Sequence, residues 1–369
     1  MTSGASPATP PSAQVALVEL VRVHLPLLRP HRDVHRAEAA RDAVLVRVEV
    51  DGVEGWGECG ALSRPGHWHE WTDGAWVVLR DLLAPAALRG EDAQLRGHPM
   101  ALAALKGAML DARLRAAGCS LAEHLGAVAT RVPAGAVVSP PGPGTAEEVA
   151  TLVAAGFQRV KVKVGPGDVG RVVALRRELP TAPLAVDANG SFDPYRDEHQ
   201  RGLDRLDEAG LICIEQPHPA DDLTAHAATS NRLGTPLCLD EPVTSPAVVR
   251  TIAALGAAAQ VCVKPPRLGG AEQAVATARA AAEAGLTSWV GSLLETGVGR
   301  SVNLAVAAAT GEVPGDLAPS ARHFDDDITP PIEMEPGGWL PVPREPGASP
   351  LPRPDRLEEA AVNRCLLRP

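Results

Sequence analysis

The second half of the chain alternates short apolar runs with segments of helix length, and this rhythm constrains the fold more than any other feature. Continuously apolar runs of this length are typical of parallel strands that are covered on both faces. The runs predict strands at 132–138, 159–164, 184–187, 211–215, 237–240, 261–264 and 287–290, with an eighth near Leu317. Helices are predicted between them, for example at 145–155, 222–233 and 271–284. Seven or eight such units in about 190 residues predict an α/β fold of the (β/α) barrel type.

The structural alternative is a doubly wound open sheet, which is built from the same kind of unit. Such a sheet normally carries a glycine-rich nucleotide-binding loop after its first strand. Here the first predicted strand is followed by Ser139-Pro-Pro-Gly-Pro-Gly, which matches that loop poorly. The barrel is therefore the preferred prediction.

The first third of the chain has a different pattern. Alternating apolar residues predict antiparallel strands at 14–24, 43–50 and 53–59, the last two joined by a tight turn at Asp51-Gly52. Helical periodicity follows at 72–83 and 99–116, and Gly118 marks the end of the second helix. We divide the chain into an α+β domain at 1–130 that begins with a mobile tail at 1–12, a barrel domain at 131–329, and a Pro- and Gly-rich segment at 330–369 that folds back over the barrel to the first domain.

The charge balance limits the partners of the protein. Its 369 residues include 45 Asp and Glu against 35 Lys and Arg, a formal net charge of −10. An acidic chain without a dense basic patch is a poor ligand for nucleic acid or an anionic membrane, so a small-molecule partner is favoured. No run approaches the length of a membrane span and no signal peptide is recognisable, which predicts a cytoplasmic protein.

The six cysteines form no Cys-x-x-Cys pair, and we expect buried thiols rather than a disulfide or a zinc site.

Lysine is rare in this chain. Only Lys106, Lys161, Lys163 and Lys264 are lysine, so 31 of the 35 basic residues are arginine. Where arginine would serve as a permanent cation, a retained lysine indicates a role that requires loss of a proton near neutral pH. Lys106 lies on a predicted helix and is interpreted as a surface residue. Lys161 and Lys163 stand two residues apart on a predicted strand, so they share one face and point into the barrel mouth.

Three acids follow successive predicted strands. Asp187, Glu215 and Asp240 stand 28 and 25 residues apart, one βα step each. In a parallel barrel the active site lies at the carboxyl ends of the strands, and neighbouring strands are about 4.8 Å apart, so the three carboxylates are expected to converge on one cation. Oxygen-only ligands suggest Mg²⁺. A single such acid is usually a helix cap or a solvated turn residue, but three in a row, framed by rare lysines, favour a metal site.

The lysines then stand on opposite sides of the predicted metal. This arrangement suits removal of a proton next to a carboxylate, because the metal and a cationic side chain stabilise the enediolate that forms while a lysine accepts the proton.

Two other clusters are interpreted without a catalytic role. The residues His67, Trp68, His69 and Trp71 are expected to form a loop that contacts the barrel mouth, and the run 325–327 of three aspartates is expected to be an exposed acidic loop.

These motifs together resemble the muconate-lactonising-enzyme-like group of the enolase superfamily, over nearly the whole chain. The matching elements occur in the family order and spacing: Lys161-Val-Lys163, Asp187-Ala-Asn189, Ile214-Glu215-Gln216-Pro217, Leu239-Asp240-Glu241 and Lys264. The segment 291–300, followed by Pro314-Gly-Asp316, and Arg267 narrow the resemblance to o-succinylbenzoate synthases and N-succinylamino acid racemases. The chain departs from the group at Gly291-Ser292-Leu293, where Gly-Gly-Met is more common. This departure affects the expected shape of the distal part of the substrate pocket and leaves the expected proton chemistry unchanged.

The resemblance implies a fold and a set of roles. The fold is a modified TIM barrel, (β/α)₇β, closed by an N-terminal α+β capping domain. Asp187, Glu215 and Asp240 would bind Mg²⁺, for which Mn²⁺ can substitute. Lys163 would be the base, Lys264 would face it across the substrate, and Lys161 would tune Lys163. Asn189 and Glu241 would support the metal shell. The substrate would be held by Ser139, Asn189, Arg267, Gly291, Ser292, Leu293 and Glu295.

The leading hypothesis is a Mg²⁺-dependent o-succinylbenzoate synthase, a lyase that dehydrates the cyclohexadiene carboxylate precursor of menaquinone by syn elimination. The first alternative is racemisation of an N-succinylamino acid, in which Lys163 and Lys264 each exchange a proton on one face of the α-carbon. The second alternative is a non-catalytic metal-binding barrel. The choice of succinylated substrate and association into a homo-oligomer stay open at this level.

Overall fold

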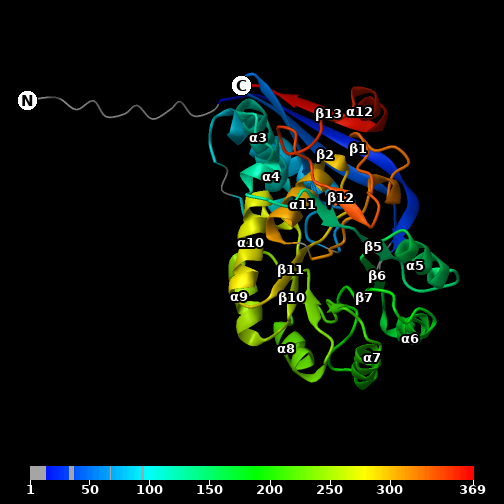
Figure 1. Ribbon diagram of the computed structural model, residues 1–369. Helices are drawn as coiled ribbons and strands as arrows, with labels where there is room; N and C mark the ends of the chain where they lie inside the picture. The colour runs from blue at the N-terminus through cyan, green and yellow to red at the C-terminus, as the bar shows by residue number, and fades with distance from the viewer. Residues whose placement is uncertain (1–13, 33–36, 67, 93–94, 312) are drawn as a thin grey trace, which may run out of the picture.

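The structure is a computed structural model that describes residues 14–32, 37–66, 68–92, 95–311 and 313–369 (Figure 1). The tail predicted at 1–12 and His67 of the aromatic cluster lie outside the described residues. An antiparallel sheet with helices packed against it lies above a ring of βα units in Figure 1. Strand β13 (Ala361–Leu367) lies beside β1 (Val15–Arg32), although the two stand at opposite ends of the chain.

The antiparallel sheet has four strands in the order β13-β1-β2-β3, where β2 is Ala37–Val50 and β3 is Val53–Cys59. The predicted turn between β2 and β3 is confirmed, because Asp51 and Gly52 both have left-handed φ angles of 50° and 81°, as the tightest hairpin turns require. Strands β1 and β2 are longer than predicted. Their ladder of backbone pairs continues to Arg32 and Ala37, beyond the apolar alternation from which the sequence prediction was made.

The helices in the first third of the chain pack against the four-stranded antiparallel sheet. The helix predicted at 72–83 is longer and irregular: α1 (Thr72–Val78) passes through a π-helical turn, η1 (Leu79–Leu83), into α2 (Ala84–Leu88). Helix α3 (Pro99–Ala117) ends at Gly118, whose φ of 65° is left-handed, as predicted. Helix α3 lies against Gly55 and Gly57 of β3, where an added Cβ would come within 2.2 Å and 2.1 Å of helix backbone oxygens. A short helix, α4 (Leu121–His124), follows.

Seven parallel strands form the second sheet, in the order β11-β10-β9-β8-β7-β6-β5. The order follows the chain without a reversal, so the doubly wound alternative is wrong. The strands are β5 (Gly135–Val138), β6 (Arg159–Lys163), β7 (Leu184–Asp187), β8 (Ile214–Glu215), β9 (Leu237–Leu239), β10 (Gln260–Val263) and β11 (Thr287–Val290). Figure 1 shows the helices on the outside of the curled sheet: α5 (Thr145–Ala154), α6 (Val169–Glu178), α7 (Asp197–Asp207), α8 (Leu223–Arg232), α9 (Pro246–Leu255), α10 (Ala271–Glu283) and α11 (Gly297–Thr310).

The continuous strand predicted at 132–138 is wrong, because the run is split at Ala134. Its first part, β4 (Arg131–Pro133), pairs with β12 (Trp339–Pro341) of the C-terminal segment rather than with the barrel. Pro133 has no N–H to donate to a ladder and is therefore suited to the edge of a two-stranded sheet. After β12 the chain forms α12 (Pro354–Ala360) and then β13, which pairs with β1. Single 3₁₀ turns are found at η2 (Pro166–Asp168), η3 (Pro265–Leu268) and η4 (Ser320–Arg322).

The predicted eighth strand is a short irregular segment that closes the ring. The Asp316 amide donates to the carbonyl oxygen of Val290 on β11 (3.1 Å), and the Gly135 amide on β5 donates to the carbonyl oxygen of Leu317 (2.8 Å). The α/β fold with a curled parallel sheet and an N-terminal antiparallel sheet confirms the predicted modified TIM barrel. Among the described residues, none of the helices combines the length and apolarity that a bilayer crossing requires.

Closure of the ring depends on the absence of a side chain at Gly135. A Cβ there would lie 1.8 Å from the carbonyl oxygen of Gly315. We expect Gly135→Ala to lower the free energy of unfolding by about 3 kcal/mol or more, because backbone must move to relieve the overlap. The matched control is Gly107→Ala within helix α3, where an added Cβ meets nothing within 4 Å and should raise stability by up to about 1 kcal/mol. Urea unfolding of both variants checks this, and equal stabilities would contradict it.

Candidate active site

The carboxyl ends of the barrel strands bring together the lysines and acids that the sequence singled out. Lys161 and Lys163 lie on β6, Asp187 ends β7, and Glu215 ends β8. Pairing between adjacent strands sets Lys163 beside Asp187 and Asp187 beside Glu215. Asp240 and Lys264 directly follow β9 and β10, and all six of these side chains are buried.

Lys161 is bound by three carboxylates. Its Nζ donates to both oxygens of Glu215 at 3.0 and 2.9 Å and to Asp316 Oδ2 at 2.5 Å, and it lies 3.1 Å from Asp187 Oδ2. Burial alone would lower the pKa of Lys161, but these carboxylates, Asp316 first, raise the pKa well above its usual value. Lys161 is therefore a fixed cation at the base of the cluster.

Lys163 and Lys264 each donate to a different acid of the cluster. Lys163 Nζ donates to Asp187 Oδ2 at 2.6 Å and to Asn189 Oδ1 at 2.8 Å. Lys264 Nζ donates to Asp240 Oδ2 at 2.7 Å. Burial lowers the pKa of Lys264, and the neighbouring Asp240 carboxylate more than offsets this, so that the pKa is raised overall.

Two further predicted residues extend this network. Arg267, one turn after Lys264, forms an ion pair with Asp240 and also donates from Nη1 to the Asp240 carbonyl oxygen at 3.1 Å. The Asn189 amide nitrogen Nδ2 donates to Glu241 Oε1 at 3.3 Å. Burial and the neighbouring Asp240 raise the pKa of Glu241 to about 7.

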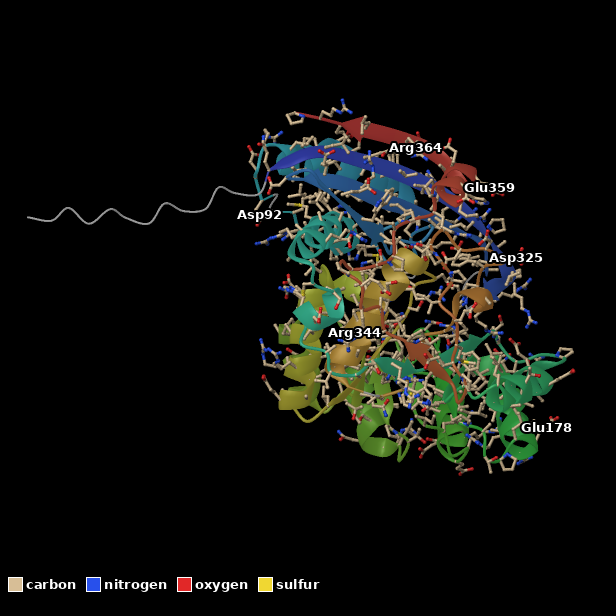
Figure 2. The ribbon with its side chains drawn as sticks, turned by 45° about the horizontal axis from the view of Figure 1, so that its top comes forward. Asp92, Glu178, Asp325, Arg344, Glu359 and Arg364 are labelled. Carbon is tan, nitrogen blue, oxygen red and sulfur yellow. The ribbon has the colours of Figure 1, made fainter. Side chains whose placement is uncertain are left out.

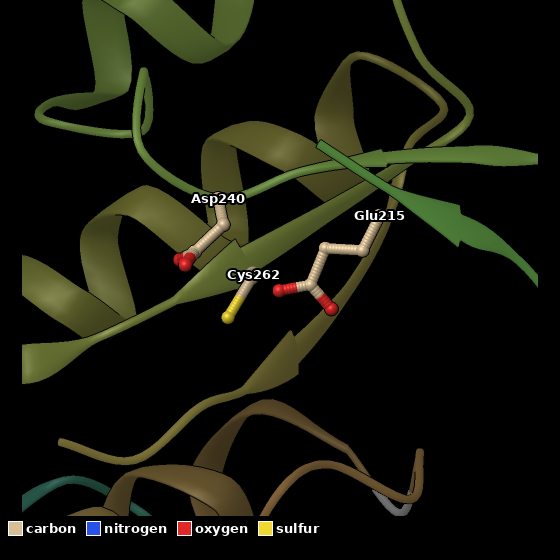
Figure 3. A group of neighbouring side chains, drawn as sticks. All are labelled: Glu215, Asp240 and Cys262. Atoms are coloured by element: carbon tan, nitrogen blue, oxygen red, sulfur yellow. The ribbon is translucent and has the colours of Figure 1, made fainter. Parts of the chain in front are cut away.

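Two of the three predicted metal ligands come together beside a thiol. Carboxylate oxygens of Glu215 and Asp240 and the sulfur of Cys262 all lie within 4.8 Å of one another, and Figure 3 shows the three side chains. Among the described residues Asp187 is not a member of this group, and its Oδ2 is bound by Lys161 and Lys163 instead. Burial, and then the charge of Asp187, raises the pKa of Glu215 to about 8. Lys163 and Lys161 hold the pKa of Asp187 well below its usual value in spite of its burial. Three buried carboxylates that repel one another in this way form a site in which a cation would be stabilised.

A cavity of about 60 Å³ connects the lysines to the loop at 291–295. Glu295 shapes this loop, because one of its oxygens accepts from Ser292 Oγ (2.7 Å) and from the Leu293 amide (2.8 Å). At Gly291 an added Cβ would lie 2.7 Å from Lys264 Cε, so the lysine needs glycine there. The cavity is lined by Lys161, Lys163, Lys264, Ser292, Leu293, Leu294, Asp316, His31, Leu62, Gly135, Val137, Ala318 and His323.

Some predicted residues lie apart from the lysines. Ser139 lines a separate cleft together with Arg29, Glu148 and Arg322. The aspartate run at 325–327 is only partly the exposed loop that was predicted. Asp325 is exposed, and Figure 2 shows it at the edge of the molecule. Asp327 is buried, and one of its oxygens accepts from the amide of Gly297 at the start of α11.

The predicted contact of the aromatic loop with the barrel mouth is confirmed for Trp68. Its ring lies 5.2 Å from the guanidinium carbon of Arg267, the residue that binds Asp240. The adjoining Glu70 accepts from the amides of Met100 and Ala101 at the start of α3, at 2.8 and 3.1 Å, which ties the loop to the helix.

The sequence reasoning missed a second layer beneath the lysines. Arg159 stacks on Trp289, with 3.8 Å between the guanidinium carbon and the ring centroid, and its nitrogens lie 3.6 Å from Glu215 and 4.0 Å from Asp316. The available signal was position: Arg159 stands two residues before Lys161 on one strand and therefore shares its face. Cys262 stands two residues before Lys264 in the same way.

A buried histidine on α8 is expected to give the fold a pH dependence. His226 Nδ1 lies 2.8 Å from the Asp222 carbonyl oxygen, and Nε2 accepts from the His218 amide at 3.3 Å, so the ring is neutral with its proton on Nδ1. Burial lowers the pKa of His226 to about 4, from 6.5. Because the folded pKa is the lower one, the unfolded chain binds more protons, and stability is lost as pH falls from about 6.5 toward about 4.

We expect His226 to lower the free energy of unfolding by about 3 kcal/mol between pH 7 and pH 4. Urea unfolding at several pH values, compared between the wild type and His226→Gln, isolates the contribution, because the variant should lose less stability on acidification. His69→Gln, at a histidine exposed at the surface, is the control and should follow the wild type. Identical acid profiles for the wild type and His226→Gln would contradict the prediction.

Comparison with known proteins places this site in a family. A sequence model described as "Enolase C-terminal domain-like" matches residues 144–355. The chain is 39% identical to an N-succinylamino acid racemase from Amycolatopsis sp, over 94% of this chain and 97% of that protein. It is 33% identical to the o-succinylbenzoate synthase of Bacillus subtilis (strain 168), over 90% and 93% of the two chains. A solved structure of an enolase superfamily member from Listeria innocua Clip11262 superimposes with a TM-score of 0.90 at 28% identity, covering 96% and 99%. The chain therefore belongs to the enolase superfamily.

Proposed function

We propose that the protein is a Mg²⁺-dependent o-succinylbenzoate synthase, which dehydrates the cyclohexadiene carboxylate precursor of menaquinone to 2-succinylbenzoate. One observation carries the proposal: Lys163 and Lys264 line a single cavity from β6 and from the end of β10, and each donates to a different carboxylate of one buried acid cluster. Three strands separate β6 from β10 in the sheet, so the two amines approach a bound molecule from different sides.

Asp187, Glu215 and Asp240 would hold Mg²⁺, for which Mn²⁺ can substitute. Bound there, the ion would neutralise negative charge that develops on the substrate carboxylate. The fit rests on three buried carboxylates at the ends of successive strands, two of which, Glu215 and Asp240, have oxygens within 4.8 Å of each other. It rests also on the pKa of Glu215, which burial and then the charge of Asp187 raise to about 8. Glu241 and Asn189 would support this shell through the hydrogen bond between them.

Lys163 would perform the proton transfers. Its Nζ takes the proton next to the substrate carboxylate, and the electron pair of that C–H bond moves into the enediolate. The leaving hydroxyl then departs as water with the proton returned from Nζ, and the ring becomes aromatic. Lys264, whose pKa is raised by Asp240, would stabilise the enediolate as a cation. Lys161 would tune Lys163 through Asp187, since both amines lie close to its Oδ2.

The division into a capping domain at 1–130, a barrel at 131–329 and a returning segment at 330–369 belongs to the same proposal. His31 and Leu62 reach the lysine cavity from the first part, and β13 joins the sheet of that part from the end of the chain. The capping domain would thereby enclose a small carboxylate substrate. We propose that the loop at 291–295 and Arg267 hold the rest of the substrate. The substrate contact of Ser139 stays a prediction from the sequence, because Ser139 lines a cleft apart from the lysine cavity.

Racemisation of an N-succinylamino acid is the second candidate. It is favoured by the relative at 39% identity that carries this name and by the presence of an amine on each side of one cavity. The two reactions are separated by incubating the enzyme with a chiral N-succinylamino acid in D₂O and, in parallel, by following dehydration of the cyclohexadiene substrate. Dehydration without exchange of the α-hydrogen identifies the synthase, and exchange without dehydration identifies the racemase. If neither reaction occurs and calorimetry detects no Mg²⁺ binding, both activities are refuted.

Lys264→Arg distinguishes the roles of the second lysine. A dehydratase needs a cation at this position, whereas a racemase needs a group that gives and takes a proton, which arginine does not do near neutral pH. We expect the variant to keep dehydration within about a hundredfold of the wild type while racemisation falls by about 10³-fold or more. Lys106→Arg, at a lysine whose side chain is 51% exposed, is the matched control. Equal loss of both reactions would show that Lys264 has the same role in each.

A further inference from the structure

His323 is a polar residue of the lysine cavity that the proposed proton chemistry does not use. It lines the cavity and directly follows the turn η4. Its backbone is fixed on both sides, because its amide donates to the Ser320 carbonyl oxygen and its carbonyl oxygen accepts from the amide of Leu28 on β1, both at 2.9 Å. The ring is therefore held where the antiparallel sheet meets the barrel.

The imidazole ring of His323 is available to a bound molecule. The side chain is only partly buried. Within the part of the chain that the structure describes, the ring lies beside that of Phe324, with 6.2 Å between the centroids, and forms no hydrogen bond. Neither ring nitrogen is sealed off from solvent, so a molecule in the cavity can reach the ring. A neutral imidazole in this position can donate from one nitrogen and accept at the other.

The charged groups that act on this ring are basic. Burial lowers the pKa of His323 well below its usual value, and the neighbouring Arg300, His31 and Arg322 lower it further. The ring is therefore neutral near pH 7, and it keeps one N–H to donate. An anion placed beside the ring would be stabilised by the same basic neighbours that oppose a positive charge on it.

The two arginines are already held by the protein. Arg300 donates to the Glu295 carbonyl oxygen at 2.7 Å, and Arg322 donates to Glu148 Oε1 at 2.6 Å. They contribute positive charge to the surroundings of the ring, whereas His323 has hydrogen-bonding capacity left over. A carboxylate at this position would accept from the imidazole N–H, and hydrogen bonds to a charged group are stronger than those between neutral groups.

We propose that His323 binds the distal carboxylate of the succinyl group and thereby selects succinylated substrates. The inference rests on the proposed function, since both candidate substrates carry this group. His323 stands at the side of the cavity that borders the cleft of Ser139, because Val137 and His323 line the cavity while the adjoining Val138 and Arg322 line the cleft. A succinyl group that extends from the acid cluster toward this side would meet the ring.

The test compares two ligands that differ only at the distal end. 2-Succinylbenzoate ends in a carboxylate, and 2-butanoylbenzoate ends in a methyl group and is otherwise the same. Calorimetry with the full-length, Mg²⁺-loaded protein measures the affinity for each. We expect the wild type to prefer 2-succinylbenzoate and His323→Leu to weaken its binding by about tenfold or more, the loss expected for a hydrogen bond to a charged group. Binding of 2-butanoylbenzoate should be unchanged.

Three further variants sharpen the comparison. His323→Phe, which keeps a ring but has no donor, should behave like His323→Leu. His323→Gln, whose amide can donate, should recover part of the preference for the carboxylate. His124→Leu, at an exposed histidine on α4 that does not line the cavity, is the matched control and should bind both ligands like the wild type. The same variants are measured with the N-succinyl and N-butanoyl forms of one amino acid, so the test holds for either candidate reaction.

The outcomes separate this inference from the proposed function. If the wild type turns over a succinylated substrate while His323→Leu and His323→Phe keep the full preference for the carboxylate, the inference is wrong and the function stands. An equal loss of affinity for both ligands would show that the ring supports the cavity as a whole, and it would also overturn the inference. If the wild type neither binds nor turns over a succinylated ligand, the proposed function is refuted together with this role of His323.

Discussion

Lys163→Ala is expected to lower turnover by about 10³-fold or more for either candidate substrate while leaving the fold intact. In the dehydration this amine takes the proton from carbon, and in the racemisation it takes or gives the proton on one face of the α-carbon. Alanine can do neither. The variant should remain folded because Asp187 keeps a cationic partner: Lys161 Nζ lies 3.1 Å from the same oxygen that Lys163 binds. The buried carboxylate is therefore not left without a compensating charge.

The measurement is kcat with each substrate, together with circular dichroism and the melting temperature of the variant. Lys106→Ala, which removes an exposed lysine from α3, serves as the control and should retain wild-type turnover. Added methylamine should restore part of the lost rate if the defect is a missing base. A folded Lys163→Ala enzyme that keeps more than about a tenth of the wild-type kcat would rule out Lys163 as the base, since general-base catalysis contributes about 10²-fold or more.

The barrel and the residues at its strand ends could be predicted because each βα unit has its own local sequence pattern. An apolar run of four to seven residues followed by an acid or a lysine places that side chain at the carboxyl end of a parallel strand, whatever the rest of the chain does. Strands β7 and β11 have the predicted bounds, and Asp187 ends its strand as expected. The acids and lysines were accessible to sequence reasoning for this local reason.

What could not be predicted depends on partners that are distant in sequence. The strand pattern places Arg159 on the same face as Lys161, but the burial of this charge depends on Trp289 and Asp316 in a later part of the chain. Asp316 itself lies 155 residues from Lys161, the amine that it binds. The split of the first barrel run has the same origin, because β12 from the C-terminal segment provides the partner of β4. A local pattern contains no information about such contacts.

The roles of the three acids differ in a way that the strand pattern did not reveal. Asp187 and Asp240 each accept from one of the two lysines that are proposed to act on the substrate, Lys163 and Lys264. Glu215 instead binds Lys161, the third lysine that lines the cavity, with both oxygens, and it lies 3.6 Å from Arg159. Glu215 therefore contacts neither Lys163 nor Lys264, and its proposed contribution to the reaction is to hold the metal ion. It is the acid whose substitution best separates metal binding from proton transfer.

Glu215→Gln should accordingly remove Mg²⁺ binding and activity together. Glutamine keeps the volume of the side chain but loses one negative charge from a set of three, so we expect Mg²⁺ affinity to fall by about 10²-fold and turnover at limiting Mg²⁺ by about 10³-fold or more. Removing the ion from the wild type with EDTA should give the same loss, reversed by Mg²⁺ or Mn²⁺. Calorimetric titration with Mg²⁺ measures the affinity, and Glu178→Gln, on helix α6 at the surface in Figure 2, is the control.

Because Lys163 and Lys264 are untouched in Glu215→Gln, a variant that loses Mg²⁺ but still exchanges the substrate α-hydrogen with D₂O at the wild-type rate would show that proton transfer does not require the ion. If instead the exchange and the binding of Mg²⁺ disappear together, the acid cluster and the two lysines work as one site.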